Sequence, residues 1–268
     1  MKELYFEEKG IYYRTNDFKP EKKTIVFIHG VSGSCSAWWP FEKIFKNKYN
    51  ILTYDIRGHG KSKKYPKYED YSVKNFANDL YDLVTFLKIE KFILISSSFA
   101  TLIAREYLKD HRKTVTALVF TSTEAFNENE LRIKIIRPVL KAMTNVISLF
   151  PFNPKIRGHV DYSKLKNWDW SPERNFADTR NTGLRSQFFT IRQSFVPGQN
   201  YELEKINVPT LIIHGEKDSI IPIKNAIDFS KKIKNSKFIK IQKFDHDIHH
   251  NAVKEMSEAI EDFVNEIK

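Results

Sequence analysis

The stretch that decides the fold reads FILISSSFATLIAREYL and runs from Phe92 to Leu108. Four apolar residues at 92–95 predict a buried strand, and the apolar spacing from Thr101 onward predicts a helix. Three consecutive serines begin the corner between them. A strand, a tight corner and a helix in this order place a serine hydroxyl above the end of a sheet. We therefore expect a nucleophilic serine here, with partners further along the chain at Asp218 and His246.

The choice among the three serines follows from steric limits at such a corner. The nucleophile has a strained backbone, and strand and helix approach closely on either side, so the residues two before and two after it must be small. Ser98 meets this condition, because those positions hold Ser96 and Ala100. The other two serines would place a bulky side chain there: Leu94, Ile95 or Phe99. Ser98 is thus the candidate nucleophile, and on the pentapeptide alone a serine-rich strand end that caps a helix is the alternative.

Strand and helix patterns alternate along most of the chain. Apolar runs predict buried strands at 24–28, 51–54, 92–95, 117–120, 210–213 and 237–241. Helical periodicity lies between them, at about 38–45, 73–87, 101–108, 223–233 and 251–267. Residues 4–14 predict a hairpin before the first of these strands. The alternation indicates an α/β fold, a mostly parallel central sheet with helices on both faces.

Residues 124–204 interrupt this alternation, because they show no buried-strand pattern. They contain an amphipathic basic stretch, 131–150, and an aromatic segment that includes Trp168 and Trp170. We therefore predict a helical cap at 124–204, inserted into a core domain formed by the chain on either side, residues 1–123 and 205–268. Three roles stay open for the apolar face of the cap: packing over its own domain, lining a pocket with the two tryptophans, or contact with a membrane surface.

Composition limits the class of protein. The chain has 268 residues, of which 41% are hydrophobic and 14% aromatic, as expected of a globular protein with a sizeable core. The single cysteine, Cys35, excludes an internal disulfide and fits a reducing compartment. The N-terminal residues lack the apolar segment of a signal peptide, and no apolar run is long enough to span a bilayer. These features favour a cytoplasmic location.

The formal net charge is +11, from 44 Lys and Arg against 33 Asp and Glu. A positive field of this size attracts nucleic acids, anionic lipids and anionic substrates. The charge is spread along the chain, however, and no nucleic-acid-binding motif accompanies it. We therefore expect a solvated, lysine-rich surface and no nucleic-acid partner.

Polar residues follow the predicted strands at the points where the strands end. In an open parallel sheet, ligands bind beyond the carboxyl ends of the strands, so these residues are the candidates for chemistry. In chain order they are His29-Gly30-Val31, the loop 55–62, Ser98, Asp218 and His246. A serine hydroxyl needs a base to become a nucleophile, an imidazole can supply that base near neutral pH, and a carboxylate can orient the imidazole.

These strand ends resemble the motifs of the α/β-hydrolase fold family. Residues 55–62, DIRGHGKS, match the family's D-x-R-G-x-G-x-S loop, and His29-Gly30 resembles its oxyanion loop. The segment 215–222 resembles the turn that holds the acid, and Asp245-His246 resembles the usual Gly-His. The resemblance spans about residues 24–123 and 205–267. The serine corner departs from G-x-S-x-G, since Ser96 and Ala100 replace both glycines.

The resemblance implies a serine hydrolase and assigns its residues. Ser98 would attack a carbonyl, His246 would carry the proton and Asp218 would orient His246. The backbone amides of Val31 and Phe99 would stabilise the oxyanion. The predicted substrate is a carboxylic ester with a small to medium hydrophobic acyl or aromatic group, bound by His29, Gly30, Trp168 and Trp170. We expect no cofactor and no metal.

Several alternatives stay open at this stage. Glu124 could replace Asp218 as the acid, and His249 or His250 could replace His246, although we expect both to face solvent at a helix start. The same triad would serve C–C bond, thioester, lactone or peptide hydrolysis and acyl transfer. Ser98 occupies the position of an aspartate nucleophile and so disfavours epoxide-hydrolase chemistry. A binding protein that has lost turnover is the alternative outside enzymes. No zinc-ligand spacing, P-loop or dinucleotide fingerprint occurs in the sequence.

Overall fold

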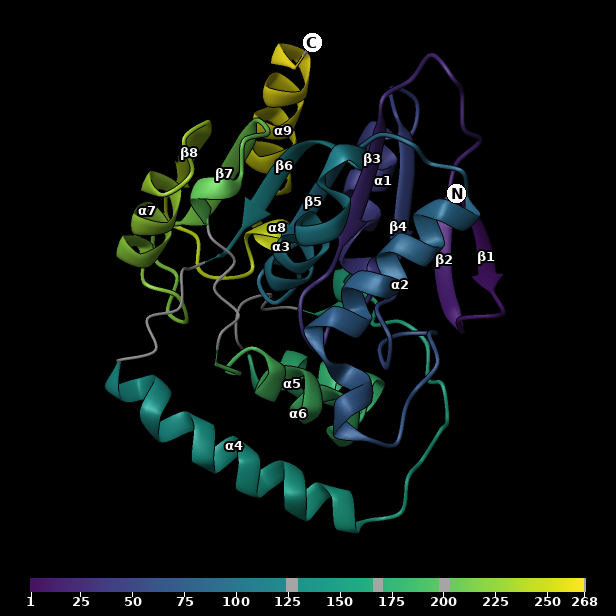
Figure 1. Cartoon of the computed structure of the whole chain (residues 1–268), viewed down its shortest axis with the longest axis vertical. Helices are drawn as coiled ribbons and strands as arrows, with labels where there is room; N and C mark the ends of the chain where they lie inside the picture. The colour runs from purple at the N-terminus through teal and green to yellow at the C-terminus, as the bar shows by residue number, and fades with distance from the viewer. Residues whose placement is uncertain (124–129, 166–170, 198–202, 268) are drawn as a thin grey trace.

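The computed structural model describes residues 1–123, 130–165, 171–197 and 203–267. Its centre is an eight-stranded sheet in the order β1-β2-β4-β3-β5-β6-β7-β8 (Figure 1). In chain order the strands are β1 (Lys2–Phe6), β2 (Ile11–Thr15), β3 (Thr24–Ile28), β4 (Asn50–Tyr54), β5 (Phe92–Ser97), β6 (Val115–Thr121), β7 (Thr210–Gly215) and β8 (Ser236–Ile241). β3 to β8 are parallel, and β1 and β2 form the antiparallel edge. The predicted mostly parallel sheet is confirmed.

Helices cover both faces of the sheet. Figure 1 shows α2 (Val73–Phe86) and α3 (Ala100–His111) on one face, and α1 (Trp39–Phe45) and α9 (Val253–Glu266) on the other. Two short elements complete these layers, α7 (Ile223–Lys231) and α8 (Ile248–Asn251). The predicted helix at 38–45 begins with a 3-10 turn, Cys35–Trp38, that leads into α1.

Two apolar cores result from the alternation of side chains along each strand. On β3, Val26 and Ile28 belong to the core under α2 and α3, whereas Ile25 and Phe27 belong to the core under α1 and α9. This alternation follows from the two-residue period of a strand. A strand that is apolar at every position therefore predicts a sheet covered on both faces, as found here.

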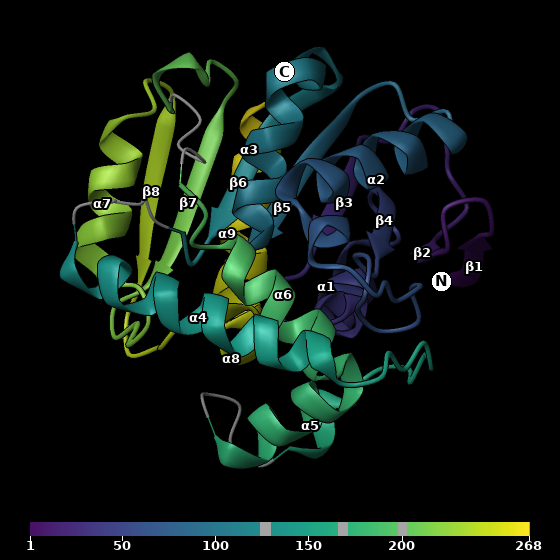
Figure 2. The same cartoon turned by 60° about the horizontal axis from the view of Figure 1, so that its bottom comes forward.

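Among the described residues between β6 and β7, three α-helices occur: α4 (Leu131–Leu149), α5 (Pro172–Thr182) and α6 (Leu184–Gln193). No strand occurs among the described residues of this segment. Figure 2 shows these helices crossing the end of the sheet where the parallel strands finish. The cap boundaries stay a prediction, and Glu124, Trp168 and Trp170 lie outside the described residues. Among the described helices, none has both the length and the apolar character needed to cross a bilayer.

Candidate active site

Ser98 occupies the corner between β5 and α3. Its φ is 52°, in the left-handed region that residues other than glycine rarely adopt. Two backbone hydrogen bonds hold the corner, because the Ser98 amide donates to the Thr121 carbonyl at 2.9 Å and the Ser98 carbonyl accepts from the Thr101 amide at 2.9 Å. Ser96 and Ala100 are fully buried on either side, so small residues are required there. The backbone thus presents the Ser98 hydroxyl at the end of the sheet.

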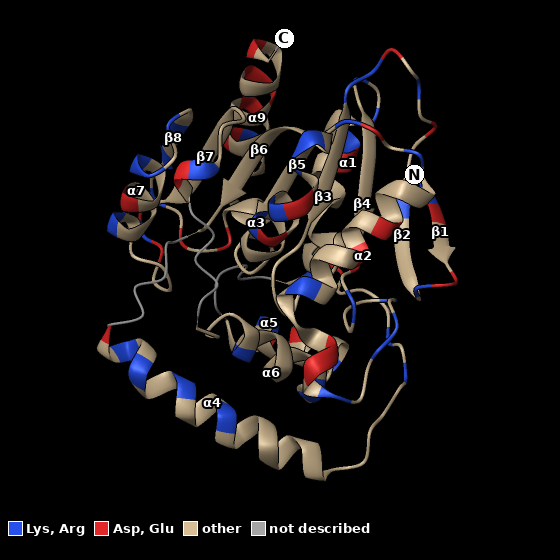
Figure 3. Cartoon of the chain, in the orientation of Figure 1, with Lys and Arg blue, Asp and Glu red and all other residues tan. Residues whose placement is uncertain are grey.

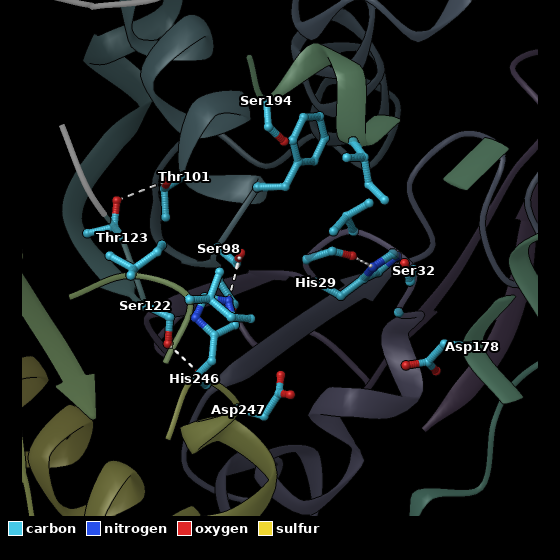
Figure 4. A pocket seen from close by; sticks show the side chains of 18 of the residues that line it. His29, Ser32, Ser98, Thr101, Ser122, Thr123, Asp178, Ser194, His246 and Asp247 are labelled. Atoms are coloured by element: carbon cyan, nitrogen blue, oxygen red, sulfur yellow. Dashed lines mark hydrogen bonds between the residues drawn. The ribbon is translucent and has the colours of Figure 1, made fainter. Parts of the chain in front are cut away.

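Three segments distant in sequence bring a serine, a histidine and an aspartate together (Figure 4 shows the first two). His246 Nε2 lies 3.0 Å from Ser98 Oγ, and His246 Nδ1 lies 2.9 Å from Asp218 Oδ2. Asp218 follows β7 and His246 follows β8. Because the Nδ1 proton is donated to the carboxylate, the Nε2 lone pair is left to accept the serine proton. The structure therefore joins the three predicted residues in one hydrogen-bonded relay.

The loop after β7 holds the Asp218 carboxylate in its ionised form. Oδ1 accepts from the amides of Ile220 at 2.9 Å and Ile221 at 2.8 Å. Burial raises the pKa of Asp218, but the hydrogen bond and charge of His246, the Ile221 amide and His214 together lower the pKa below its usual value. Asp218 is therefore a carboxylate at neutral pH, as the orienting role requires.

His214 is a neighbour of this site to which the sequence assigns no role. Its Nε2 lies 2.9 Å from the Ile221 carbonyl, to which it donates, and 3.2 Å from Asp218 Oδ2. Burial lowers the pKa of His214, so it stays neutral and supplies one N–H to the acid loop. The sequence offers one signal for His214, because this polar residue directly follows the predicted strand 210–213 and precedes Gly215.

Opposing effects act on the pKa of His246. Burial lowers this pKa, whereas the hydrogen bond and charge of Asp218 raise it, with smaller contributions from Asp247 and Asp245. The raising effects prevail, so the pKa of His246 lies above its ordinary value. An imidazole in this position can both accept the serine proton and return it to a leaving group.

The loop after β3 faces Ser98 from the other side. A Cβ on Gly30 would lie 3.3 Å from the Ser97 carbonyl oxygen, so the loop approaches the serine corner closely. His29 Nδ1 donates to the Gly30 carbonyl at 2.7 Å, and its Nε2 accepts from the Ile56 amide at 3.1 Å. Both ring nitrogens are thus used by the backbone, and burial lowers the pKa of His29. His29 orders the loop that carries Val31 and is not placed to transfer protons.

The loop 55–62 forms hydrogen bonds with segments that lie next to the site. Asp55 accepts from the amides of Cys35 and Lys61, each at 2.7 Å, and its Oδ2 also lies 2.7 Å from His159 Nε2. Gly60 has a φ of 48°, and a Cβ there would lie 2.2 Å from the Asp55 carboxylate. Arg57 likewise binds Asp79 through two hydrogen bonds of 2.6 Å. These contacts assign the D-x-R-G-x-G-x-S loop a structural role.

Cys35, Asp55 and His159 form a group with metal-ligand atom types in the described part of the chain. His159 Nε2 lies 3.7 Å from Cys35 Sγ as well as 2.7 Å from Asp55 Oδ2. Burial raises the pKa of the Cys35 thiol well above its usual value, with Asp55 adding to the effect, so the thiol is protonated. The observed contacts make this group a hydrogen-bonded link between the cap segment and the core.

A cavity of about 290 Å³ opens beside Ser98 and His246. His29, Gly30, Val31 and Phe99 are among the residues that line it, and their oxyanion and substrate-binding roles stay predictions. Cap residues line the opposite wall. Besides Val31 and Phe99, the apolar members of the lining are Ala37, Leu102, Ile136, Ile191, Phe195, Ile220 and Ile221. The two predicted tryptophans, Trp168 and Trp170, lie outside the described residues.

His249 and His250 are buried, at 6% and 7% exposure, so the expectation that they face solvent is wrong. Trp38 contacts the His249 ring at a centroid distance of 5.5 Å, and Tyr162 of the cap segment covers His250 at 4.2 Å. Burial lowers the pKa of His249 to about 3 and that of His250 well below its usual value. Both therefore line the cavity as uncharged side chains. His250 is buried because Tyr162 of the cap segment covers it.

An ion-pair network joins the cap to the loop of His246. Arg174 of α5 pairs with Asp247, the residue after His246, and its Nε lies 3.3 Å from Asp178 Oδ2. The Tyr162 hydroxyl donates to Asp178 Oδ1 at 2.8 Å. Asp178 lies four residues after Arg174 on the same helix, but Asp247 and Tyr162 come from separate segments, so the sequence does not reveal the network. The network fixes α5 against the wall of the cavity.

Comparisons with known proteins agree with this architecture. A family model described as the alpha/beta hydrolase fold matches residues 23–253. Epoxide hydrolase 1 of Caenorhabditis elegans is 23% identical to this chain, and the match covers 91% of the chain and 65% of the nematode protein. A putative non-heme chloroperoxidase of Synechocystis is 26% identical, and that match covers 87% of the chain and 84% of the relative.

A solved structure shows the same fold at lower identity. The structure of an alpha/beta hydrolase enzyme from a Medee basin deep-sea metagenome library has a TM-score of 0.77 and 19% identity, covering 100% of this chain and 98% of that one. This likeness concerns the fold alone. Because the family model spans most of the sequence, the chain belongs to the alpha/beta hydrolase fold family.

Proposed function

We propose that this protein is a serine hydrolase that cleaves carboxylic esters through an acyl-enzyme. One observation carries the proposal: Ser98 Oγ, His246 Nε2 and Nδ1, and Asp218 Oδ2 are linked at 3.0 and 2.9 Å beside a cavity. The relatives carry different activities by name, so the reaction is inferred from the residues of this chain. Ser98 stands where an aspartate nucleophile would be needed for epoxide opening.

The proposed reaction has two steps. Ser98 Oγ attacks the ester carbonyl carbon while its proton passes to His246 Nε2, and the carbonyl oxygen becomes an oxyanion facing the amides of Val31 and Phe99. The C–O bond breaks, and His246 returns the proton to the leaving alcohol. Water then loses a proton to His246 and attacks the acyl carbon. The bond between that carbon and Ser98 Oγ breaks, His246 returns the proton to Oγ, and the carboxylic acid leaves.

The cavity supports a substrate of limited size with an apolar group. Its volume of about 290 Å³ lies at the small end for ligand pockets, and side chains such as Leu102, Ile191 and Ile221 line it. We therefore propose esters with a small to medium hydrophobic acyl or aromatic group. The cap at 124–204 supplies part of this lining. A cytoplasmic location, supported by the single buried Cys35, completes the proposal.

The test uses p-nitrophenyl esters of increasing acyl length together with a fluorophosphonate probe. Ser98→Ala should lower kcat by on the order of 10⁶-fold and abolish labelling, because the attacking oxygen is lost. Ser97→Ala removes the neighbouring hydroxyl and should keep both labelling and turnover. Circular dichroism checks that each variant folds.

Two results would contradict the proposal. Labelling or turnover by Ser98→Ala at the wild-type level would exclude Ser98 as the nucleophile. A folded wild-type protein that the probe does not label would indicate a binding protein. Labelling of Ser98 without ester turnover would keep the nucleophile and reject the ester, and C–C, thioester and lactone substrates would then be tested.

A further inference from the structure

One side of α4 exposes a continuous row of apolar side chains to solvent. Its members recur every three or four residues, which places them along one side of a helix. Their exposed fractions lie between 38 and 84%. They are Leu131, Ile135, Val139, Met143, Val146 and Leu149, with Phe150 directly after the helix. Of the three roles left open for the apolar face of the cap, packing over its own domain therefore does not hold for these residues.

The opposite side of α4 makes the contacts with the rest of the cap. Ile133, Leu140 and Thr144 are buried there, and α4 packs against α6. Figure 1 shows α4 at the outer edge of the molecule, farther from the sheet than α6. The helix is thus held in place by one side, and the exposed row is not required for its packing.

The charge along the exposed row is mostly positive, although Glu130, which directly precedes α4, pairs with Arg132. From 131 to 160 the sequence contains no Asp or Glu and six Lys or Arg, at positions 132, 134, 137, 141, 155 and 157. Lys134 and Lys141 are seven residues apart, so they lie on one side of α4, next to the apolar row. Figure 3 shows the basic positions along this helix. An apolar row beside a basic edge is the pattern of helices that lie in the interface of an anionic membrane.

We infer that α4 docks on an anionic lipid surface, with its apolar row in the interface and its basic residues against the headgroups. Apolar burial and attraction of Lys and Arg to anionic lipids act in the same direction. A second copy of the chain fits this face poorly, because each α4 carries four Lys or Arg and two such helices would bring eight like charges together. The inference does not rest on Ser98 or on ester hydrolysis.

The test measures cosedimentation of the full chain with vesicles. Vesicles of phosphatidylglycerol mixed with phosphatidylcholine should bind the protein, and vesicles of phosphatidylcholine alone should bind it much less. Added salt should weaken binding, since it screens the attraction between Lys or Arg and the headgroups. Ser98→Ala should bind as the wild type does, which separates docking from catalysis.

One double variant tests the apolar row of α4, and a second double variant with the same substitutions elsewhere is its control. Ile135→Gln with Leu149→Gln should lower vesicle affinity at least about tenfold, because two buried side chains are lost from the interface. Leu4→Gln with Ile44→Gln makes the same changes at exposed positions on β1 and α1 and should keep wild-type affinity.

The basic edge of α4, formed by Lys134 and Lys141, is tested in the same way. Lys134→Gln with Lys141→Gln should lower affinity roughly tenfold to thirtyfold and reduce the salt dependence. Lys43→Gln with Lys254→Gln removes the same charge from exposed positions on α1 and α9 and should have a much smaller effect.

Three results would overturn the inference. The first is a wild-type protein that binds neither kind of vesicle. The second is equal binding by the wild type and both α4 double variants. The third is a dimer in size-exclusion chromatography with light scattering that Ile135→Gln with Leu149→Gln dissociates, since a second copy would then occupy the face.

Discussion

At the residue scale, the backbone of Ser98 ties the fold to the proposed chemistry. A φ of 52° is unfavourable for a serine, and the surrounding structure must supply the free energy that maintains it. Two backbone hydrogen bonds and the tight packing of Ser96 and Ala100 do so. The absence of glycine at both flanking positions does not prevent the corner from forming, because serine and alanine are small enough.

The charge of Asp218 should control the pH dependence of the proposed reaction. His246 must be neutral to act as a base, and Asp218 raises the pKa of His246 against the effect of burial. The acid limb of kcat/KM for the wild type should therefore have its midpoint above 6.5, the ordinary value for histidine. Asp218→Asn should lower kcat by on the order of 10⁴-fold and move the residual acid limb to lower pH.

Asp161→Asn is the matched control for this prediction. Asp161 is an exposed carboxylate of the cap segment that pairs with Lys164, so its loss should leave the pH profile in place. Rates of p-nitrophenyl ester hydrolysis across a series of buffers provide both profiles. An unchanged midpoint in Asp218→Asn would show that this carboxylate does not set the pKa of His246.

Asp178 should make the stability of the protein depend on pH. Burial raises the pKa of Asp178 from 3.8 to about 6, although Arg174 acts in the opposite direction. The folded state therefore favours the protonated acid, so the stability that Asp178 contributes is fully present below 3.8 and is lost as the pH rises through about 6. The change corresponds to about 3 kcal/mol.

The matched comparison uses Asp178→Asn and denaturant unfolding at several pH values. Relative to the wild type, the variant should gain free energy of unfolding by up to about 3 kcal/mol between about pH 4 and pH 7. The asparagine cannot ionise, whereas its amide oxygen can still accept from Tyr162. A difference that stays constant over this pH range would contradict the raised pKa.

At the element scale, α5 connects the cap to both loops of the site. Thr182, the last residue of α5, donates to the Ser32 carbonyl at 2.8 Å in the oxyanion loop. Arg174, in the first turn of α5, pairs with Asp247 beside His246. One short helix is thus fixed at both ends to segments that position the proposed catalytic groups. Movement of α5 would therefore alter the oxyanion loop and the His246 loop together.

Removal of Arg174 should destabilise this connection. Arg174→Gln leaves Asp178 and Asp247 without their shared cation in a buried environment, and breaking such a pair costs about 3–5 kcal/mol. Arg180→Gln removes the same charge from an exposed position of α5 and should cost less than about 0.5 kcal/mol. Free energies of unfolding measured by denaturant titration separate the two. If the two variants lost the same free energy of unfolding, the buried network would stabilise the protein no more than an exposed charge does.

At the scale of the whole molecule, the parallel sheet assembles the site. β5, β7 and β8 end at the same edge, so Ser98, Asp218 and His246 meet although 148 residues separate the first from the last. The positions of the strands along the chain and their apolar character follow from periodicity, which is a local property of the chain. The fold class was therefore predictable from the strand and helix patterns, and the three relay residues from the strand ends together with the steric limits at the serine corner and the resemblance to the family's motifs.

The remaining parts of the site depend on contacts between distant segments. His249 and His250 lie near the start of a helix, where solvent is the ordinary expectation, but Tyr162 and Trp38 cover them. The Arg174 network and the role of His214 likewise require knowledge of which segments are neighbours. Local patterns in the sequence do not contain that information.

The sequence by itself determined where the strands lie, which residues end them, and that one helix of the cap has an apolar side. The tertiary structure alone decided that this side of α4 faces outward and that two histidines of α8 face inward. The physical reason is that periodicity reports how side chains distribute around an element. Whether a given side is covered depends on the other elements that pack against it.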